Sequence, residues 1–165
     1  MIYIYTDGSS RGNPGPGGWG VILKSEKHYK ELSGGFSCTT NNRMELYAVI
    51  MGLEAVKIRN AEITIYSDSC YVCDPVNKGW LRVWVSKRFL NKKNEDLWIR
   101  FLNVYQKHRV SLVWVKGHAG HIENERCDQM AVEAALQQNL PEDIEYNRIK
   151  SDSLFNKSEE KDIFT

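Results

Sequence analysis

Four acidic side chains stand at comparable places along this chain of 165 residues. Asp7 and Asp68 each end a short run of β-branched and aromatic residues, a composition that favours strands. Glu45 falls at the start of an amphipathic helical pattern, and Asp128 lies within a later one. Because chemistry gathers outside the carboxyl ends of strands in open α/β sheets, Asp7 is the first candidate for a functional site.

Convergence of these four acids would require cations. Two carboxylates ~4 Å apart repel each other by roughly 4 kcal/mol at an effective dielectric near 20. Ligand sets made only of oxygen select hard ions such as Mg²⁺ or Mn²⁺. Two such ions ~3.5 to 4 Å apart promote in-line displacement at phosphorus, in which one activates water and the other stabilises the leaving oxygen. That chemistry needs no serine or cysteine nucleophile.

Each acid also has a purely structural interpretation. Asp7 before a glycine is typical of an Asx-turn, and Glu45 has the spacing of a capping box with Asn42. Asp128 lies among small apolar residues, where an uncompensated charge is unfavourable. No single motif decides between structure and chemistry.

The hydrophobic pattern predicts the elements that would position these acids. The predicted strands are 2–7, 19–23, 30–36, 63–68 and 111–116, and helices are predicted to open at 39–45, near 70, over 95–108 and near 123. Residues 12–18 are rich in Gly and Pro and predict a loop. Short connections favour antiparallel pairing early in the chain, and strands 2–7 and 63–68 as neighbours would bring Asp7 and Asp68 together.

Composition predicts one folded unit with a polar tail. The hydrophobic fraction of 42% suffices for one core, which we assign to residues 1–140. Residues 141–165 are polar and acidic and are predicted to be partly disordered. Four cysteines without a signal-peptide pattern favour a reducing, cytoplasmic location, and no apolar run approaches the ~20 residues that span a bilayer. A monomer is the simplest expectation.

The segment 77–94 is the clearest electrostatic feature, because it carries Lys and Arg side chains, aromatic side chains and no acid. Such a segment suits nucleic acid, although a solvated face is the plainer interpretation. Cys70 and Cys73 have the spacing of a redox pair but are more simply incidental. His118, in the glycine-containing loop 117–121, is either a bystander or a participant. The chain lacks a P-loop, which disfavours nucleoside triphosphates.

Several motifs share one order along the chain. They are Asp7-Gly8-Ser9, 12–18, 39–45, 64–71, 114–121 and 123–128. Together they resemble the motifs of type 1 ribonuclease H and cover residues 1 to about 140. The resemblance implies an α/β, ribonuclease H-like fold with a five-stranded mixed sheet flanked by helices, three antiparallel strands coming first and parallel strands after them.

The same resemblance implies an endonuclease that hydrolyses the RNA strand of RNA·DNA hybrids and leaves 5′-phosphate and 3′-hydroxyl ends. It implies two Mg²⁺ ions per site, with Mn²⁺ able to substitute. Asp7 would bridge both metals and Asp128 would complete the water-activating site. Glu45 and Asp68 would complete the leaving-group site. His118 would match a loop histidine associated with proton transfer or product release.

The resemblance also implies a set of substrate contacts. The matched positions are Asn13, Thr40, Asn41, Asn42, Cys70, Trp80 and Asn94. Thr40 and Asn94 match positions that grip a DNA-strand phosphate, and Trp80 belongs to a basic protrusion at about 77–94. Cys70 replaces a glutamine, and Ile122 replaces a proline of the histidine loop, which bears on minor-groove contacts and on loop mobility.

Three other functions stay open at this stage. A binding module could hold hybrid or double-stranded RNA without cutting it, but it would not need four acids. Related nucleases and integrases use acidic two-metal sites on DNA, whereas the motif at 41–45 and the protrusion favour the hybrid. A redox protein would depend on Cys70 and Cys73.

Overall fold

A computed structural model describes the backbone of residues 1–162 and the side chains of residues 1–154. Its elements in chain order are β1 (Ile2–Ser10), β2 (Gly15–Lys24), β3 (Tyr29–Thr39), α1 (Asn41–Glu54), β4 (Glu62–Ser67), α2 (Cys70–Asn77), α3 (Trp80–Ser86), α4 (Glu95–Tyr105), β5 (Arg109–Trp114), α5 (Ile122–Ala135) and α6 (Ile144–Asp162). No helix among the described residues is both long enough and apolar enough to cross a membrane.

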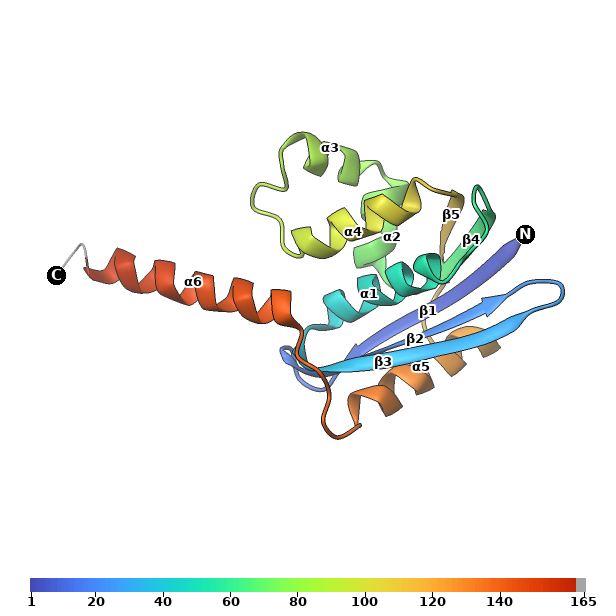
Figure 1. Ribbon diagram of the computed structural model, residues 1–165, viewed down its shortest axis with the longest axis horizontal. Helices are drawn as coiled ribbons and strands as arrows, with labels where there is room; N and C mark the ends of the chain where they lie inside the picture. The colour runs from blue at the N-terminus through green and yellow to red at the C-terminus, as the bar shows by residue number, and fades with distance from the viewer. Residues whose placement is uncertain (163–165) are drawn as a thin grey trace.

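The five strands form one mixed sheet in the order β3-β2-β1-β4-β5 (Figure 1). β1 pairs antiparallel with β2, and β2 with β3, while β4 runs parallel to β1 and to β5. The predicted five-stranded mixed sheet, with antiparallel strands first and parallel strands after them, is therefore confirmed.

β1 pairs with β2 over a longer stretch than with β4. The parallel register with β4 runs from Ile2 to Tyr5, whereas the antiparallel register with β2 continues to Ser10 and sets Asp7 opposite Gly20. The predicted end of the first strand at Asp7 is wrong, because β1 continues to Ser10, and the prediction of a loop throughout 12–18 is wrong as well. The glycines from Gly15 onward form the start of β2 and supply the backbone partner that extends β1.

Helices cover both faces of the sheet. α1 lies on one face beside α2 and α4, and α5 lies on the other (Figure 1). The larger core, with Ile4, Trp98 and Phe101 fully buried, lies on the side of α1. On the α5 side, a Cβ on Gly18 or Gly20 would overlap backbone atoms of the helix, so these glycines permit its close approach.

The start of α1 differs from the capping-box prediction. The N-cap is Thr40, whose side chain accepts a hydrogen bond from the Arg43 backbone N–H at 3.2 Å. With Thr40 as the N-cap, the acid of a capping box would have to stand at position 43, which is an arginine, and not at position 45. Glu45 lies one turn inside the helix and is buried, which frees its carboxylate for another role.

Arg43 ties α1 to two distant segments. Its guanidinium is 2% exposed and donates to both carboxylate oxygens of Asp143, with Nε at 2.8 Å and Nη2 at 3.0 Å. It also donates to both oxygens of Asp96 in α4, at 2.9 and 2.8 Å. Thr39 donates its hydroxyl to Asp143 at 2.8 Å, which gives the buried acid a further partner.

A helix lies within the segment after residue 140. The backbone of α6 is described to residue 162 and its side chains to residue 154, while residues 163–165 lie outside the described part of the chain. The partial disorder expected for 141–165 stays a prediction. Ser37 donates its backbone N–H to the Pro141 carbonyl at 2.9 Å, and the Tyr146 backbone N–H donates to Asp143 Oδ1 at 3.3 Å. A buried acid thus anchors the start of a helix whose described side chains are largely exposed. The domain boundary at 140 stays a prediction.

Removal of Arg43 should be severely destabilising. Arg43→Ala leaves Asp143 and Asp96 without their cation, and breaking a buried charge network costs about 3–5 kcal/mol. Arg126→Ala is the matched control, because Arg126 makes an exposed pair with Glu31 and should cost under about 1 kcal/mol. Urea unfolding measures both changes, and similar losses for the two variants would contradict the role of Arg43.

Candidate active site

Three of the four acids form a compact cluster. Asp7, Glu45 and Asp68 each place one carboxylate oxygen within 4.8 Å of the others. Asp7 and Glu45 are buried, at 8% and 7% exposure, and Asp68 is partly exposed. These residues come from β1, from α1 and from the turn that follows β4.

Local structure explains this convergence. The parallel register pairs Tyr5 with Tyr66, so the following residues of both strands reach the same edge and bring Asp7 and Asp68 together. Glu45 joins them because Gly8 has no side chain, since a Cβ there would overlap the backbone of Met44 and Glu45. The glycine after Asp7 therefore lets the first turn of α1 approach β1.

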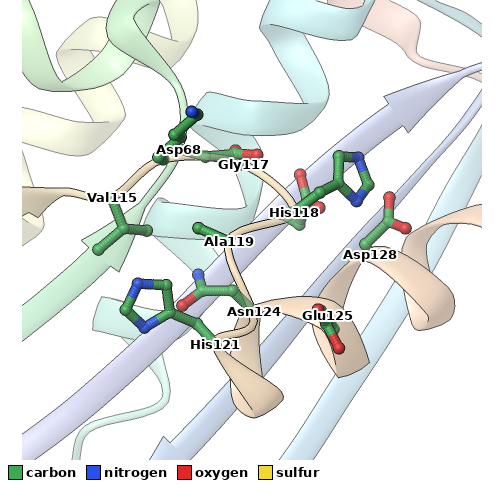
Figure 2. A pocket seen from close by; sticks show the side chains of 11 residues that line it. Asp68, Val115, Gly117, His118, Ala119, His121, Asn124, Glu125 and Asp128 are labelled. Atoms are coloured by element: carbon green, nitrogen blue, oxygen red, sulfur yellow. The ribbon is translucent and has the colours of Figure 1, made fainter.

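Asp128 faces the same acids from the other face of the sheet. It lies on α5 and lines a pocket together with Asp7, Asp68 and His118 (Figure 2). His118 belongs to the loop after β5, has a φ of 55°, and presents its ring to this pocket, as does the carboxylate of Asp128 (Figure 2). Asp7 belongs to both the cluster and the pocket, so the structure brings all five predicted catalytic residues to one place.

The acids perturb one another strongly. Burial raises the pKa of Asp7 to about 7, the charges of Asp68 and Asp128 contribute to this rise, and the Gly8 N–H at 2.8 Å opposes it. Burial, followed by the charge of Asp7, raises the pKa of Glu45 well above its usual value. Burial also raises the pKa of Asp68, against the charge of His118. The cluster therefore cannot carry its full negative charge without compensation.

The donor set fits a hard divalent cation. Each of the three clustered residues offers a carboxylate oxygen, the ligand type that Mg²⁺ and Mn²⁺ prefer. Glu45 Oε2 is buried and has no hydrogen-bond partner among the described residues, which leaves an oxygen available to an ion. The open pocket beside Asp7 gives access from solvent.

Most predicted substrate contacts lie beside a second depression. Asn13, Thr40, Asn42 and Asn94 line one groove. Asn13 Oδ1 accepts the Asn41 backbone N–H at 3.2 Å, which joins the loop after β1 to the start of α1. The groove therefore connects four of the residues that the sequence marks as hybrid contacts.

Asn94 is held in place from two sides. Its Nδ2 donates to the Tyr71 hydroxyl at 2.9 Å, and its Oδ1 accepts from Arg43 at 3.3 Å. Two other predicted contacts lie outside the groove. Cys70 is exposed in the first turn of α2, and Trp80 on α3 is 44% exposed with the Lys78 ammonium 5.2 Å from its ring centre.

A family model described as RNase H matches residues 1–136. The chain belongs to the RNase H family. A Ribonuclease H from Trichodesmium erythraeum (strain IMS101) is 52% identical over 150 residues, which cover 88% of this chain and 95% of that protein. The family consists of endoribonucleases, so this chain is an enzyme of that class.

Solved structures of RNase H agree with the fold. A type 1 RNase H with the type 2 active-site motif superposes with a TM-score of 0.74 at 31% identity, covering 81% of this chain and 71% of that chain. An RNase H1 in complex with an RNA/DNA hybrid gives a TM-score of 0.56 at 25% identity, with coverage of 82% and 96%. The sheet and helices described above are those of the RNase H fold.

Sequence reasoning missed two groups of lining residues. Asn124 and Glu125 line the acidic pocket, and the helical spacing of Glu125 one turn before Asp128 is the signal that could have found it. Tyr146, Arg148 and Lys150 of α6 line the groove. No sequence motif marks them, because their place depends on the buried anchor at Asp143.

The cysteines give no support to a redox site. All four are free thiols, and Cys73 is buried whereas Cys70 is exposed. Burial raises the pKa of the Cys73 thiol to about 12, so it is protonated and unreactive near neutral pH.

Replacing Asp7 should stabilise the metal-free protein most at high pH. The folded-state pKa of about 7 exceeds the unfolded value near 3.8, so the stability present at low pH is lost as pH rises through 7. Asp7→Asn removes this loss of stability. The free energy of unfolding of the variant minus that of wild type should therefore be about 1–3 kcal/mol larger at pH 8 than at pH 5.

Urea unfolding in EDTA at both pH values measures this difference. Glu62→Gln, at an exposed carboxyl of β4, is the control and should show no such gain. An Asp7→Asn gain that does not grow with pH would contradict the raised pKa of Asp7.

Proposed function

We propose that this chain hydrolyses the RNA strand of RNA·DNA hybrids by two-metal-ion catalysis. The observation that carries the proposal is the cluster of Asp7, Glu45 and Asp68 opening onto a pocket that also contains Asp128, in a chain of the RNase H family. An acidic site without a nucleophilic side chain suits displacement by water at phosphorus.

The four acids would divide between two metal ions. Asp7, which belongs to both the cluster and the pocket, would hold both ions, Glu45 and Asp68 one of them, and Asp128 the other. Bound Mg²⁺ or Mn²⁺ would supply positive charge that favours hydroxide formation and offsets charge on the leaving oxygen. The water loses a proton to solvent and its oxygen bonds to phosphorus, while the bond from phosphorus to O3′ breaks and O3′ takes up a proton from solvent. The products therefore carry 5′-phosphate and 3′-hydroxyl ends.

His118 is proposed to handle protons at the edge of this site or to assist product release. It faces the pocket from a loop outside the sheet, close enough for its charge to oppose the raised pKa of Asp68. A position on an open loop suits a group that exchanges protons with solvent. Ile122 stands at the end of this loop where the resemblance implies a proline. Without the proline ring, the φ angle at position 122 is not fixed.

Substrate selection is proposed to follow from the groove beside α1. Amide groups of Asn13 and Asn42 offer donors and acceptors to the hybrid, and Thr40 with Asn94 offers a phosphate site on the DNA strand. The 2′-hydroxyl is the group by which a protein distinguishes RNA from DNA. A structural relative has been solved in complex with an RNA/DNA hybrid, which supports the same substrate here.

Cleavage of labelled substrates tests the proposal. Wild type with Mg²⁺ should cut only the RNA strand of a hybrid, leave duplex DNA and duplex RNA of the same sequence intact, and stop in EDTA. Asp7→Asn should lose about 10³-fold or more in rate, because a bound metal contributes several kcal/mol. Asp74→Asn, at an aspartate that pairs with Lys78 on α2, is the matched control and should keep full activity.

Two outcomes would replace the proposal. Hybrid binding without cleavage in Mg²⁺ or Mn²⁺ would favour a binding module. Cleavage of duplex DNA at a rate similar to the hybrid would favour a DNA nuclease.

The protrusion should contribute strongly salt-dependent binding. Neutralising Lys87, Arg88, Lys92 and Lys93 to Gln should reduce the slope of log K against log[salt] by up to about 0.9 for each phosphate that the variant no longer neutralises. Hybrid binding in EDTA at several salt concentrations measures the slope. Lys57→Gln with Lys107→Gln is the control pair, since both are exposed away from the groove. Unchanged slopes in the fourfold variant would remove the protrusion from the interface.

A further inference from the structure

The groove that holds the predicted DNA-phosphate contacts has a second wall. One wall consists of the loop after β1, the start of α1, and α4 with the residues just before it. The other wall is α6, which contributes Tyr146, Arg148, Ile149, Lys150 and Ser153. The family model ends at residue 136, so this second wall lies beyond the part of the chain that it matches.

The buried anchor fixes this wall in place. Asp143 immediately precedes α6 and accepts two hydrogen bonds from Arg43, which also donates to Asn94 on the opposite wall. The Tyr146 ring lies 5.7 Å from the Arg43 guanidinium, a cation–π distance that holds the first turn of α6 against the same side chain. A single arginine therefore positions both walls.

The groove is predominantly basic. Its cations are Arg43, Lys92, Lys93, Arg148 and Lys150, and its acids are Glu95 and Asp96. Arg43 is already paired with both Asp96 and Asp143, so the excess of positive charge comes from the three lysines and Arg148. The Lys150 side chain is exposed and makes no ion pair among residues 1–154. The excess positive charge of the groove is complementary to the negative charge of a phosphate backbone.

Arg148 is also available to a ligand. Its ion pairs with Glu145 at 3.0 Å and Asp152 at 3.3 Å are exposed, and such pairs contribute little because water and salt screen them. Exchange of these carboxylates for a phosphate therefore costs little. Ser153 adds a hydroxyl one turn further along the same wall.

We propose that α6 binds the sugar-phosphate backbone of the hybrid's DNA strand, through Lys150 and Arg148, and extends the grip beyond the catalytic domain. The inference rests on the proposed function, because it assigns a further part of the same substrate. Residues 144–153 span about 15 Å at 1.5 Å per residue, which is enough to follow about four nucleotides at 3.4 Å each. α6 projects away from the sheet (Figure 1), and residues within its stretch from Tyr146 to Ser153 line the groove.

Hybrid binding by full-length variants tests the assignment. Lys150→Gln, and Lys150→Gln combined with Arg148→Gln, should weaken binding of a 20-base-pair hybrid in EDTA about 3- to 10-fold and lower the salt slope by about 1 to 2. With Mg²⁺, KM should rise by a similar factor while kcat stays unchanged, because neither residue lines the acidic pocket. Lys150→Arg should restore wild-type binding, and Lys57→Gln should leave it unchanged.

Substrate length separates a backbone contact from a general charge effect. A hybrid too short to pass α6 should bind wild type and the Lys150→Gln variant equally. Unchanged Kd and salt slope for both variants on the long hybrid, with wild type still cleaving it, would overturn the assignment and leave the proposed function intact. Failure of wild type to bind or cut the hybrid would instead overturn the proposed function, and this inference with it.

Discussion

Mutual repulsion among buried carboxylates is the constraint that organises this molecule. Asp7, Glu45 and Asp68 place oxygens within 4.8 Å of one another, and burial raises the pKa of each. Such a cluster opposes folding unless the surrounding structure holds it. The parallel register of β1 with β4 and the bare backbone of Gly8 do so. The same crowding favours a cation, so the instability of the metal-free cluster and its affinity for metal have one origin.

A second charged group has the opposite effect on stability. Arg43 is as buried as the acids, but its donors meet the carboxylates of Asp96 and Asp143 in paired hydrogen bonds. Compensated charge stabilises the fold, whereas the uncompensated charge at Asp7 is available for chemistry. The two charge clusters occupy the same helix, since Arg43 and Glu45 are two residues apart on α1 and project to different sides. The groove that we assign to nucleic acid lies around the cluster in which Arg43 is paired with Asp96 and Asp143.

Sequence reasoning succeeded where local pattern and tertiary position coincide. The five strands and the helices α1, α2, α4 and α5 follow from local sequence patterns, whereas α3 was not predicted. The four acids stand out because strand ends and helical patterns mark them. It failed where a distant partner decided the outcome. β1 continues past Asp7 because β2 runs beside it, and α6 lines the groove because Arg43 holds Asp143 at its start.

The sequence by itself determined the family, the order of the elements and which acids stand where chemistry could occur, because residue type and spacing are local properties of the chain. Only the tertiary structure decided that Glu45 is a cluster member rather than a cap, that Asp128 faces the pocket from the opposite side of the sheet, and that α6 lines the groove. The physical reason is that burial and charge depend on neighbours remote in sequence. Burial and the charges of Asp68 and Asp128 raise the pKa of Asp7, and α6 takes its position from the pairing of Asp143 with Arg43, about a hundred residues earlier in the chain.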